Sequence, residues 1–279
     1  MIVAALIAGA AIAHAAWNLA LKRAGTGGAV FLWLAFVVGA VLFAPLGIGA
    51  VVESGGTWLW LAAVGGALQI AYFSLLQFAY RVGDVSVVYP LARGTGPLLS
   101  VVFAIVLFQE RPGILAIVGA AVVIAGVVVI GLAGGRENAV VNRPGVLAGL
   151  AVGVVIAAYT LWDSNAVING GMPPLGYYWA VLSGAVLLTP AALRQRATVL
   201  PTLRQHWRPV LIVGLLSPAA YALVLFAVQL APVSIVAPAR EVSVVLVGLA
   251  GWLLFREPHP VQRLIGAAVV LVGIAMLAL

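Results

Sequence analysis

Two arginines lie inside long apolar runs of the sequence, and both close the same repeated pattern. Arg93 ends the segment S-V-V-Y-P-L-A-R at 86–93, and Arg240 ends S-I-V-A-P-A-R at 234–240. A charge in the middle of a bilayer costs at least about 2.5–3.5 kcal/mol on insertion scales, so such residues normally face protein or a wet cavity. A planar guanidinium binds a carboxylate through two parallel hydrogen bonds. We therefore expect this pair to line a pathway and to attract a substrate carboxylate.

A structural role is the alternative for the same pair. Each arginine follows a proline, Pro90 or Pro238, which removes one helix hydrogen bond and frees a carbonyl. The guanidinium groups could cap those carbonyls, or Arg240 could pair with the adjacent Glu241. The two prolines are hinge candidates, although membrane prolines often do no more than shape a bundle. Both interpretations stay open at this point.

The first apolar run adds three residues that could contact a substrate. His14 and Asn18 are four residues apart and share one helix face, with Trp17 between them. A histidine titrates near neutral pH and could bind substrate or carry a proton, or it could simply hydrogen-bond a neighbouring helix. We expect no buried acid to accompany His14, so proton coupling and downhill facilitation are both open.

Aromatic residues with polar tips recur near the middle of other apolar runs. Such rings suit a pocket for an amphipathic or aromatic solute, whereas ordinary packing is the alternative for any single ring. The predicted substrate-binding residues are His14, Trp17, Asn18, Tyr72, Gln77, Tyr80, Tyr89, Arg93, Tyr159, Trp179, Tyr221 and Arg240.

The elements that must position these residues are membrane helices. The 279 residues are 65% hydrophobic and 8% charged, whereas a soluble domain needs about 25% charged residues. A spanning helix needs about 20 apolar residues. We predict an all-α integral membrane protein with ten transmembrane helices, at 2–21, 29–50, 57–80, 85–108, 113–134, 144–167, 174–192, 208–230, 234–255 and 260–279.

The repeat divides the chain into two halves of five helices, 1–138 and 139–279. The two prolines are 148 positions apart and the two arginines 147, so the copies differ by one inserted residue. An odd number of spans per half makes the halves insert with opposite orientation. Inverted repeats are typical of transporters, with the substrate site near the midplane between the halves.

Loop charges predict the orientation, since cytoplasmic loops are rich in lysine and arginine. The loops after the first, third, fifth, seventh and ninth spans hold Lys22, Arg23, Arg81, Arg136, Arg143, Arg194, Arg196, Arg204, Arg208, Arg256 and Arg263. The other loops hold only Arg111. We therefore expect both termini to be extracytoplasmic.

No enzyme motif is present in the sequence. It lacks a Walker loop, H-E-x-x-H and G-x-S-x-G, and it contains no cysteine. We expect no catalytic site, cofactor, metal or nucleic acid partner. Glu110 and Glu257, in F-Q-E-R-P and F-R-E-P, are expected to cap the start of the span that follows each of them.

The repeated segments, with their closing F-Q-E-R-P and F-R-E-P, resemble the drug/metabolite transporter superfamily, and in it the EamA-type permeases. The run A-A-W-N at 15–18 is similar to the first-span pattern of that family, where a glycine often stands at the position of Asn18. Among members, the sequence looks most like the aromatic amino acid exporters. Arg93 is not a general mark of the family, so its role depends on the physical argument alone.

The resemblance implies alternating-access export of small metabolites across a bacterial inner membrane. The central cavity would then be lined mainly by the first, third, fourth, sixth, eighth and ninth spans. We expect a secondary transporter or facilitator of amino acids, aromatic ones foremost, and of similar amphipathic metabolites. A passive channel-like pore and a membrane interaction protein without flux are the alternatives. The expected partners are a small-molecule substrate and the lipid bilayer, and the expected unit is a monomer.

Overall fold

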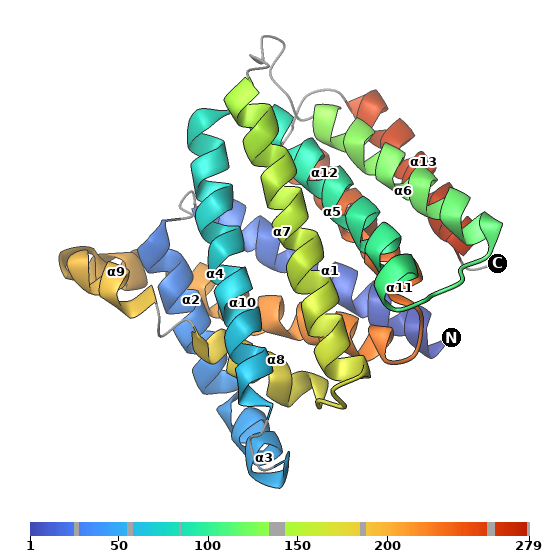
Figure 1. Ribbon diagram of the computed structural model, residues 1–279. Helices are drawn as coiled ribbons and strands as arrows, with labels where there is room; N and C mark the ends of the chain where they lie inside the picture. The colour runs from blue at the N-terminus through green and yellow to red at the C-terminus, as the bar shows by residue number, and fades with distance from the viewer. Residues whose placement is uncertain are drawn as a thin grey trace.

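The structure is a computed structural model that describes residues 1–24, 28–54, 58–83, 85–133, 143–184, 188–255 and 260–277. Within these ranges the chain forms helices and no strand (Figure 1). The helices are α1 (Ile2–Ala24), α2 (Ala29–Leu42), α3 (Ala44–Ser54), α4 (Leu59–Val82), α5 (Val85–Leu107), α6 (Ile114–Ala133), α7 (Arg143–Ile168), α8 (Pro174–Ser183), α9 (Thr189–Arg194), α10 (Arg196–Val228), α11 (Val233–Ala239), α12 (Val242–Phe255) and α13 (Pro260–Leu277).

These helices confirm the predicted all-helical membrane architecture. Helices α1, α4, α5, α7 and α10 are each long and apolar enough to cross a bilayer, and α2 with α3 forms a bent pair that passes the same test. Helices α6 and α13 contain shorter apolar segments. Each of the ten predicted stretches contains one helix or two, and three of them are divided, into α2 and α3, α8 and α9, and α11 and α12. Helix α10 begins at Arg196, twelve residues before the predicted start at 208, in a region expected to be a loop.

Prolines explain where helices bend or divide. Helix α3 begins at Ala44 with Pro45 in its first turn, where a missing N–H costs nothing, and its axis lies at 60° to that of α2. Helix α10 contains three prolines and has a kink at His206, whose φ and ψ of −122° and 24° are not helical. That kink comes three residues before Pro209, where the helix ladder loses one donor.

Helices α6 and α13 pack with their backbones in close contact. A Cβ atom added to Gly119 would lie 2.8 Å from the carbonyl oxygen of Gly273, and one added to Gly126 would lie 2.8 Å from that of Gly266. The earlier glycine of one helix thus meets the later glycine of the other, so the two helices are antiparallel. They are the last helices of the two halves, and their opposite direction agrees with the inverted repeat. Such small-residue faces allow this close approach in membranes.

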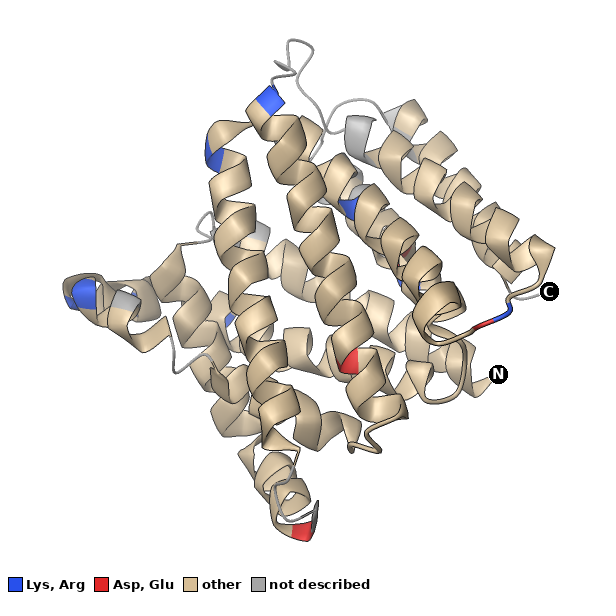
Figure 2. Cartoon of the chain, in the orientation of Figure 1, with Lys and Arg blue, Asp and Glu red and all other residues tan. Residues whose placement is uncertain are grey.

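Helices of each half pack against helices of the other half. Helix α1 of the first half packs against α10 and α12 of the second, and α7 of the second half packs against α4 and α5 of the first (Figure 1). The helices are nearly free of charged residues along their length (Figure 2). The few charges inside the bundle therefore mark its centre, where the halves meet.

Candidate functional site

A central cavity of about 90 Å³ lies between the two halves. Its wall is formed by α1, α4, α5, α7, α8 and α10 and by the junction of α11 with α12, close to the set of spans expected from the sequence. Seven of the predicted substrate-binding residues line it: His14, Trp17, Tyr72, Arg93, Tyr159, Tyr221 and Arg240.

The charged part of the wall contains one carboxylate shared by two guanidinium groups. Nη1 of Arg93 lies 3.5 Å from Oε2 of Glu241, and Nε of Arg240 lies 3.4 Å from Oε1 of the same side chain. Glu241 is 1% exposed, so its charge is removed from water and needs these partners. With two positive charges against one negative charge, the network carries a net positive charge at the cavity.

Neutral groups fix the outer ends of the two arginines. Nη2 of Arg93 lies 3.1 Å from Nε2 of His14, and Arg240 donates to Oγ1 of Thr160 at 3.3 Å. A guanidinium has no acceptor atom, so the imidazole nitrogen of His14 must accept. His14 therefore orients Arg93 toward the cavity, which is the interhelical role that the sequence left open.

Two buried donors in the cavity wall have no hydrogen-bond partner among the described residues. They are Nε1 of Trp17 and Nε of Arg240, the latter being within ion-pair distance of Oε1 of Glu241 but not hydrogen-bonded to it. Leaving a buried donor unpaired costs about 1–3 kcal/mol, so such groups normally find a protein, water or ligand acceptor. The wall is thus able to donate to a bound acceptor without breaking an existing hydrogen bond at these atoms.

The rest of the wall is a chain of tyrosine rings from four helices. The ring centroids are 5.6 Å apart between Tyr72 and Tyr159, 6.0 Å between Tyr159 and Tyr221, and 4.7 Å between Tyr221 and Tyr178. The first two pairs are edge-to-face, a geometry favoured by the ring quadrupoles. Charged and aromatic side chains therefore line the same small cavity.

The other predicted residues lie away from this wall. The amide of Asn18 donates to the carbonyl of His14 at 2.7 Å, and the indole of Trp179 donates to that of Ala40 at 2.8 Å. Tyr80 packs in a cluster around Ala79 on the side of α4 and α5. Gln77 does not line the cavity, and the ring of Tyr89 lies beside Arg93, with 5.7 Å from Cζ to the ring centroid.

Two buried acids contradict the expectation that none accompanies His14. Glu241 and Asp163 are 1% and 0% exposed. Both stand inside apolar runs, and that signal in the sequence could have identified them. Gln69, Phe73 and Tyr178 also line the cavity, although they were not among the predicted binding residues.

Three further expectations concern residues at helix ends or breaks, namely the caps Glu110 and Glu257 and the two proline hinge candidates. The carboxylate of Glu110 accepts from the backbone N–H groups of Val233 and Ser234, at 2.7 and 2.9 Å, so it caps α11 rather than the helix that follows it in sequence. Glu257 lies outside the described residues. The chain leaves the helix after Pro238, at the junction of α11 and α12, whereas α5 continues through residue 90 without a break.

Comparison with known proteins gives a family match over nearly the whole chain. A family model described as the EamA-like transporter family matches residues 1–132 and 143–279. A search of curated proteins found no match. A solved crystal structure, described only as that of a protein, superposes with a TM-score of 0.77 at 21% identity and covers 98% of this chain and 95% of its own. At that identity the likeness supports the fold alone.

Proposed function

The chain belongs to the EamA-like transporter family, and from that premise we propose that it exports amino acids, aromatic ones foremost, and related amphipathic carboxylates through the central cavity. Membership makes the protein a multi-pass membrane transporter of small molecules and not an enzyme. The nature of the substrate and the direction of transport belong to the proposal.

The network of Arg93, Arg240 and Glu241 is the observation that carries the proposal. A carboxylate entering the cavity would balance the second guanidinium charge, which Glu241 alone does not neutralise. It would also offer a hydrogen-bond acceptor to Nε of Arg240, which makes an ion pair with Glu241 but no hydrogen bond within the described residues. Charge-assisted hydrogen bonds of this kind are roughly twice as strong as neutral ones.

The tyrosine rings support an aromatic or otherwise apolar side chain on the substrate. Tyr72, Tyr159 and Tyr221 line the same cavity as the charged network, so a solute with a carboxylate at one end and a ring at the other could contact both kinds of side chain. Sites for drug-sized ligands usually measure about 300–1,000 Å³. Because the cavity is only about 90 Å³, substrate entry requires its wall to move, as alternating access demands.

Counterflow in proteoliposomes tests this function. Liposomes containing the purified protein are loaded with unlabelled phenylalanine, and uptake of labelled phenylalanine, phenylalanine amide and glucose is compared. We expect saturable exchange of phenylalanine, weaker exchange of the amide and none of glucose. Flux that does not saturate would indicate a pore, and absence of flux for every amino acid would support an interaction protein.

The carboxylate requirement is tested with Arg93→Gln against a matched control, Arg111→Gln, which removes the charge of an exposed arginine. The first variant should lose the preference for phenylalanine over its amide, and the second should keep it. Equal losses of both compounds in Arg93→Gln would assign Arg93 a structural role and contradict the proposed binding mode.

We further propose that the transporter lies in a bacterial inner membrane with both termini outside the cytoplasm. The eleven-to-one distribution of basic residues between the two sets of loops supports this orientation. A reporter that is active only in the cytoplasm, fused after Leu279, should give no signal. A fully active fusion would reverse the orientation.

A further inference from the structure

A carboxylate that does not line the cavity is buried behind its tyrosine wall. Asp163 lies in α7 and is 0% exposed. Its Oδ1 accepts from the hydroxyl of Tyr177 on α8 at 2.7 Å, and its Oδ2 accepts from the hydroxyl of Tyr221 on α10 at 2.8 Å. Three helices therefore meet at one acidic side chain.

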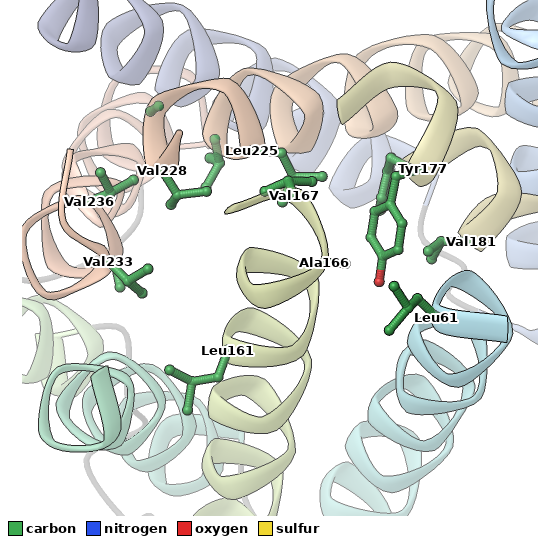
Figure 3. Packing of buried hydrophobic residues seen from close by; sticks show 14 of the residues in the cluster. Leu61, Leu161, Ala166, Val167, Tyr177, Val181, Leu225, Val228, Val233 and Val236 are labelled. Carbon is green, nitrogen blue, oxygen red and sulfur yellow. The ribbon is translucent and has the colours of Figure 1, made fainter. Parts of the chain in front are cut away.

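The surroundings of Asp163 contain no ion-pair partner within the part of the chain that the structure describes. Besides its two neutral tyrosine partners, the charged side chain of Arg240 acts on it through space rather than by contact. Helix α4 contributes Gly65, where an added Cβ would lie 2.8 Å from Oδ1 and 2.7 Å from the hydroxyl of Tyr177. Figure 3 shows Tyr177 reaching between α7 and α4, beside Leu61 and Val181. The carboxyl group is thus closely packed and has no space for a bulky counter-ion.

An ionised carboxylate in such a place is costly. Burial of a charge disfavours it strongly unless it is paired, and two neutral hydroxyl donors compensate only in part. If the group served only to tie α7, α8 and α10 together, a neutral asparagine could form two hydrogen bonds here without that cost. An acid is required where the group must change its charge, and buried acids of transporters commonly carry protons.

Tyr221 connects this acid with the cavity. Its hydroxyl contacts Asp163, and the same residue lines the cavity, where its ring packs against Tyr159 and Tyr178. A phenolic hydroxyl both donates and accepts. It can pass its proton to Oδ2 of Asp163 while it takes one from a hydronium ion in the cavity, so the phenol is restored, the hydronium becomes water and the carboxylate becomes neutral. The reverse step returns the proton.

We propose that Asp163 is the proton-binding site of this transporter and exchanges its proton with the central cavity through Tyr221. The inference extends the proposed transport function and depends on it for its role in the cycle. Protonation also has a structural effect, because it replaces two hydrogen bonds to a charged acceptor by bonds to a neutral group, which are about half as strong. The hold of Asp163 on α8 and α10 is then weaker, and both helices contribute to the cavity wall.

The first test needs no transport. Infrared difference spectra of the purified protein between neutral and acidic pH should show the carbonyl band of a protonated, buried carboxylic acid. The band should be absent from Asp163→Asn and shifted in Asp163→Glu. It should remain in Glu53→Gln, which removes an exposed acid near the end of α3. A spectrum in which Asp163→Asn retains the wild-type band overturns the proposal, whatever the protein transports.

The second test measures coupling in proteoliposomes, with phenylalanine as the probe. A pH difference of one unit, imposed in either direction, can sustain up to about a tenfold substrate gradient if one proton moves per substrate. The wild type should accumulate phenylalanine against its gradient, and Asp163→Asn should only equilibrate it while its counterflow stays within about twofold. Tyr221→Phe should slow pH-driven uptake more than tenfold yet keep the infrared band. Full pH-driven accumulation by Asp163→Asn contradicts the proposal.

The two tests separate the two possible failures. If the wild type shows counterflow but moves no substrate in response to pH, the transport function stands and the proton site is wrong. If counterflow itself is missing, the proposed function fails and the coupling role of Asp163 fails with it. Tyr177→Phe serves as the structural control, because it removes one hydrogen bond to Asp163 but leaves the path through Tyr221 intact.

Discussion

The repeated segment that ends in Arg93 or Arg240 has a different backbone conformation in each half. In the first half, Arg93 stands on α5, which runs as one helix from Val85 to Leu107. In the second half, Arg240 stands at a break, where Glu241 donates its N–H to the carbonyl three residues earlier, on Pro238, before α12 starts. The copies differ by one residue between the proline and the arginine.

This difference determines where the single acid of the network lies. Glu241 follows its arginine directly, whereas the position after Arg93 is Gly94 on a helix surface next to Val128, at 3.1 Å from an added Cβ. The repeat thus supplies two cations at related positions, and only the broken copy supplies the acid between them. The repeat therefore holds an asymmetric set of charges, which leaves one positive charge without an anionic partner among the described residues.

Glu241→Gln removes the acid that distinguishes the two copies and should have the largest effect. Both guanidinium groups would lose their only anionic partner among the described residues, and breaking a buried ion pair in this way costs about 3–5 kcal/mol. We expect a clear fall in the thermal unfolding temperature in detergent, measured by tryptophan fluorescence, together with loss of phenylalanine counterflow. Glu241→Asp should recover part of both. An unchanged unfolding temperature would show that the arginines do not depend on Glu241.

Replacing each arginine by glutamine compares the two copies directly. Arg93 has the neutral His14 as its second partner, whereas Arg240 is held by Thr160 and by Glu241 next to it in the chain. Because Glu241 is next to Arg240 in the chain, we expect it to balance the charge of Arg240 more than that of Arg93. We expect Arg93→Gln to reduce the preference for phenylalanine over its amide about tenfold, equivalent to about 1.4 kcal/mol, and Arg240→Gln to reduce it less. The measurement is competition between the two compounds in counterflow. A larger loss of preference in Arg240→Gln than in Arg93→Gln would instead identify Arg240 as the arginine that binds the carboxylate.

Glu110→Gln addresses the separate helix α11 that only the second half contains. The charged carboxylate accepts from the N–H groups of Val233 and Ser234 at the start of α11, where the helix dipole also favours negative charge. A neutral amide keeps one acceptor, so we expect a loss of about 1 kcal/mol in unfolding free energy. Glu53→Gln, at an exposed position, should cause no loss. If both variants unfold alike, α11 does not need this cap.

Tyr72→Ala should have the smallest effect and tests the aromatic residues that line the cavity together with the charges. Tyr72 lines the cavity, while Tyr80 on the same helix α4 packs outside it. Loss of one ring contact is worth about 0.5–1.5 kcal/mol, so the phenylalanine concentration for half-maximal counterflow should rise about fivefold in Tyr72→Ala. Tyr80→Ala should change it less than twofold. A similar increase of this concentration in both variants would show that Tyr72 contributes only to packing.

The membrane helices and the paired arginines could be predicted because their signals are local. Apolar runs of about 20 residues have few alternatives to a spanning helix, and a charge within such a run has to face the interior. The repeat also indicated which helix of the first half corresponds to which helix of the second half. This is why Arg93 and Arg240 were predicted to come together, and they do so at Glu241.

Most errors concern how helices face one another, which a single sequence does not encode directly. Trp179 binds the carbonyl of Ala40, which only the packed structure brings within reach, whereas Asn18 binds the carbonyl of His14 one turn earlier in its own helix. Side-chain type alone did not distinguish either residue from one that lines the cavity. Asp163 was overlooked because its partners, Tyr177 and Tyr221, are distant in sequence and are tyrosines rather than cations. The sequence named Pro238 as a hinge candidate beside the break between α11 and α12, whereas the divisions of 29–50 and 174–192 were missed, since the hydropathy of a run is the same whether it forms one helix or two.

The kinked helix α10 is too long for the bilayer it crosses. Its 33 residues rise about 50 Å at about 1.5 Å each, while the hydrocarbon layer is about 30 Å thick. We therefore expect the section before His206 to lie among the lipid headgroups of one leaflet, and its surface suits that depth. Leu200 and Leu203 are exposed for contact with acyl chains, and the guanidinium of Arg208 lies 5.2 Å over the ring of Trp207, at the level where aromatic and basic side chains anchor a membrane protein.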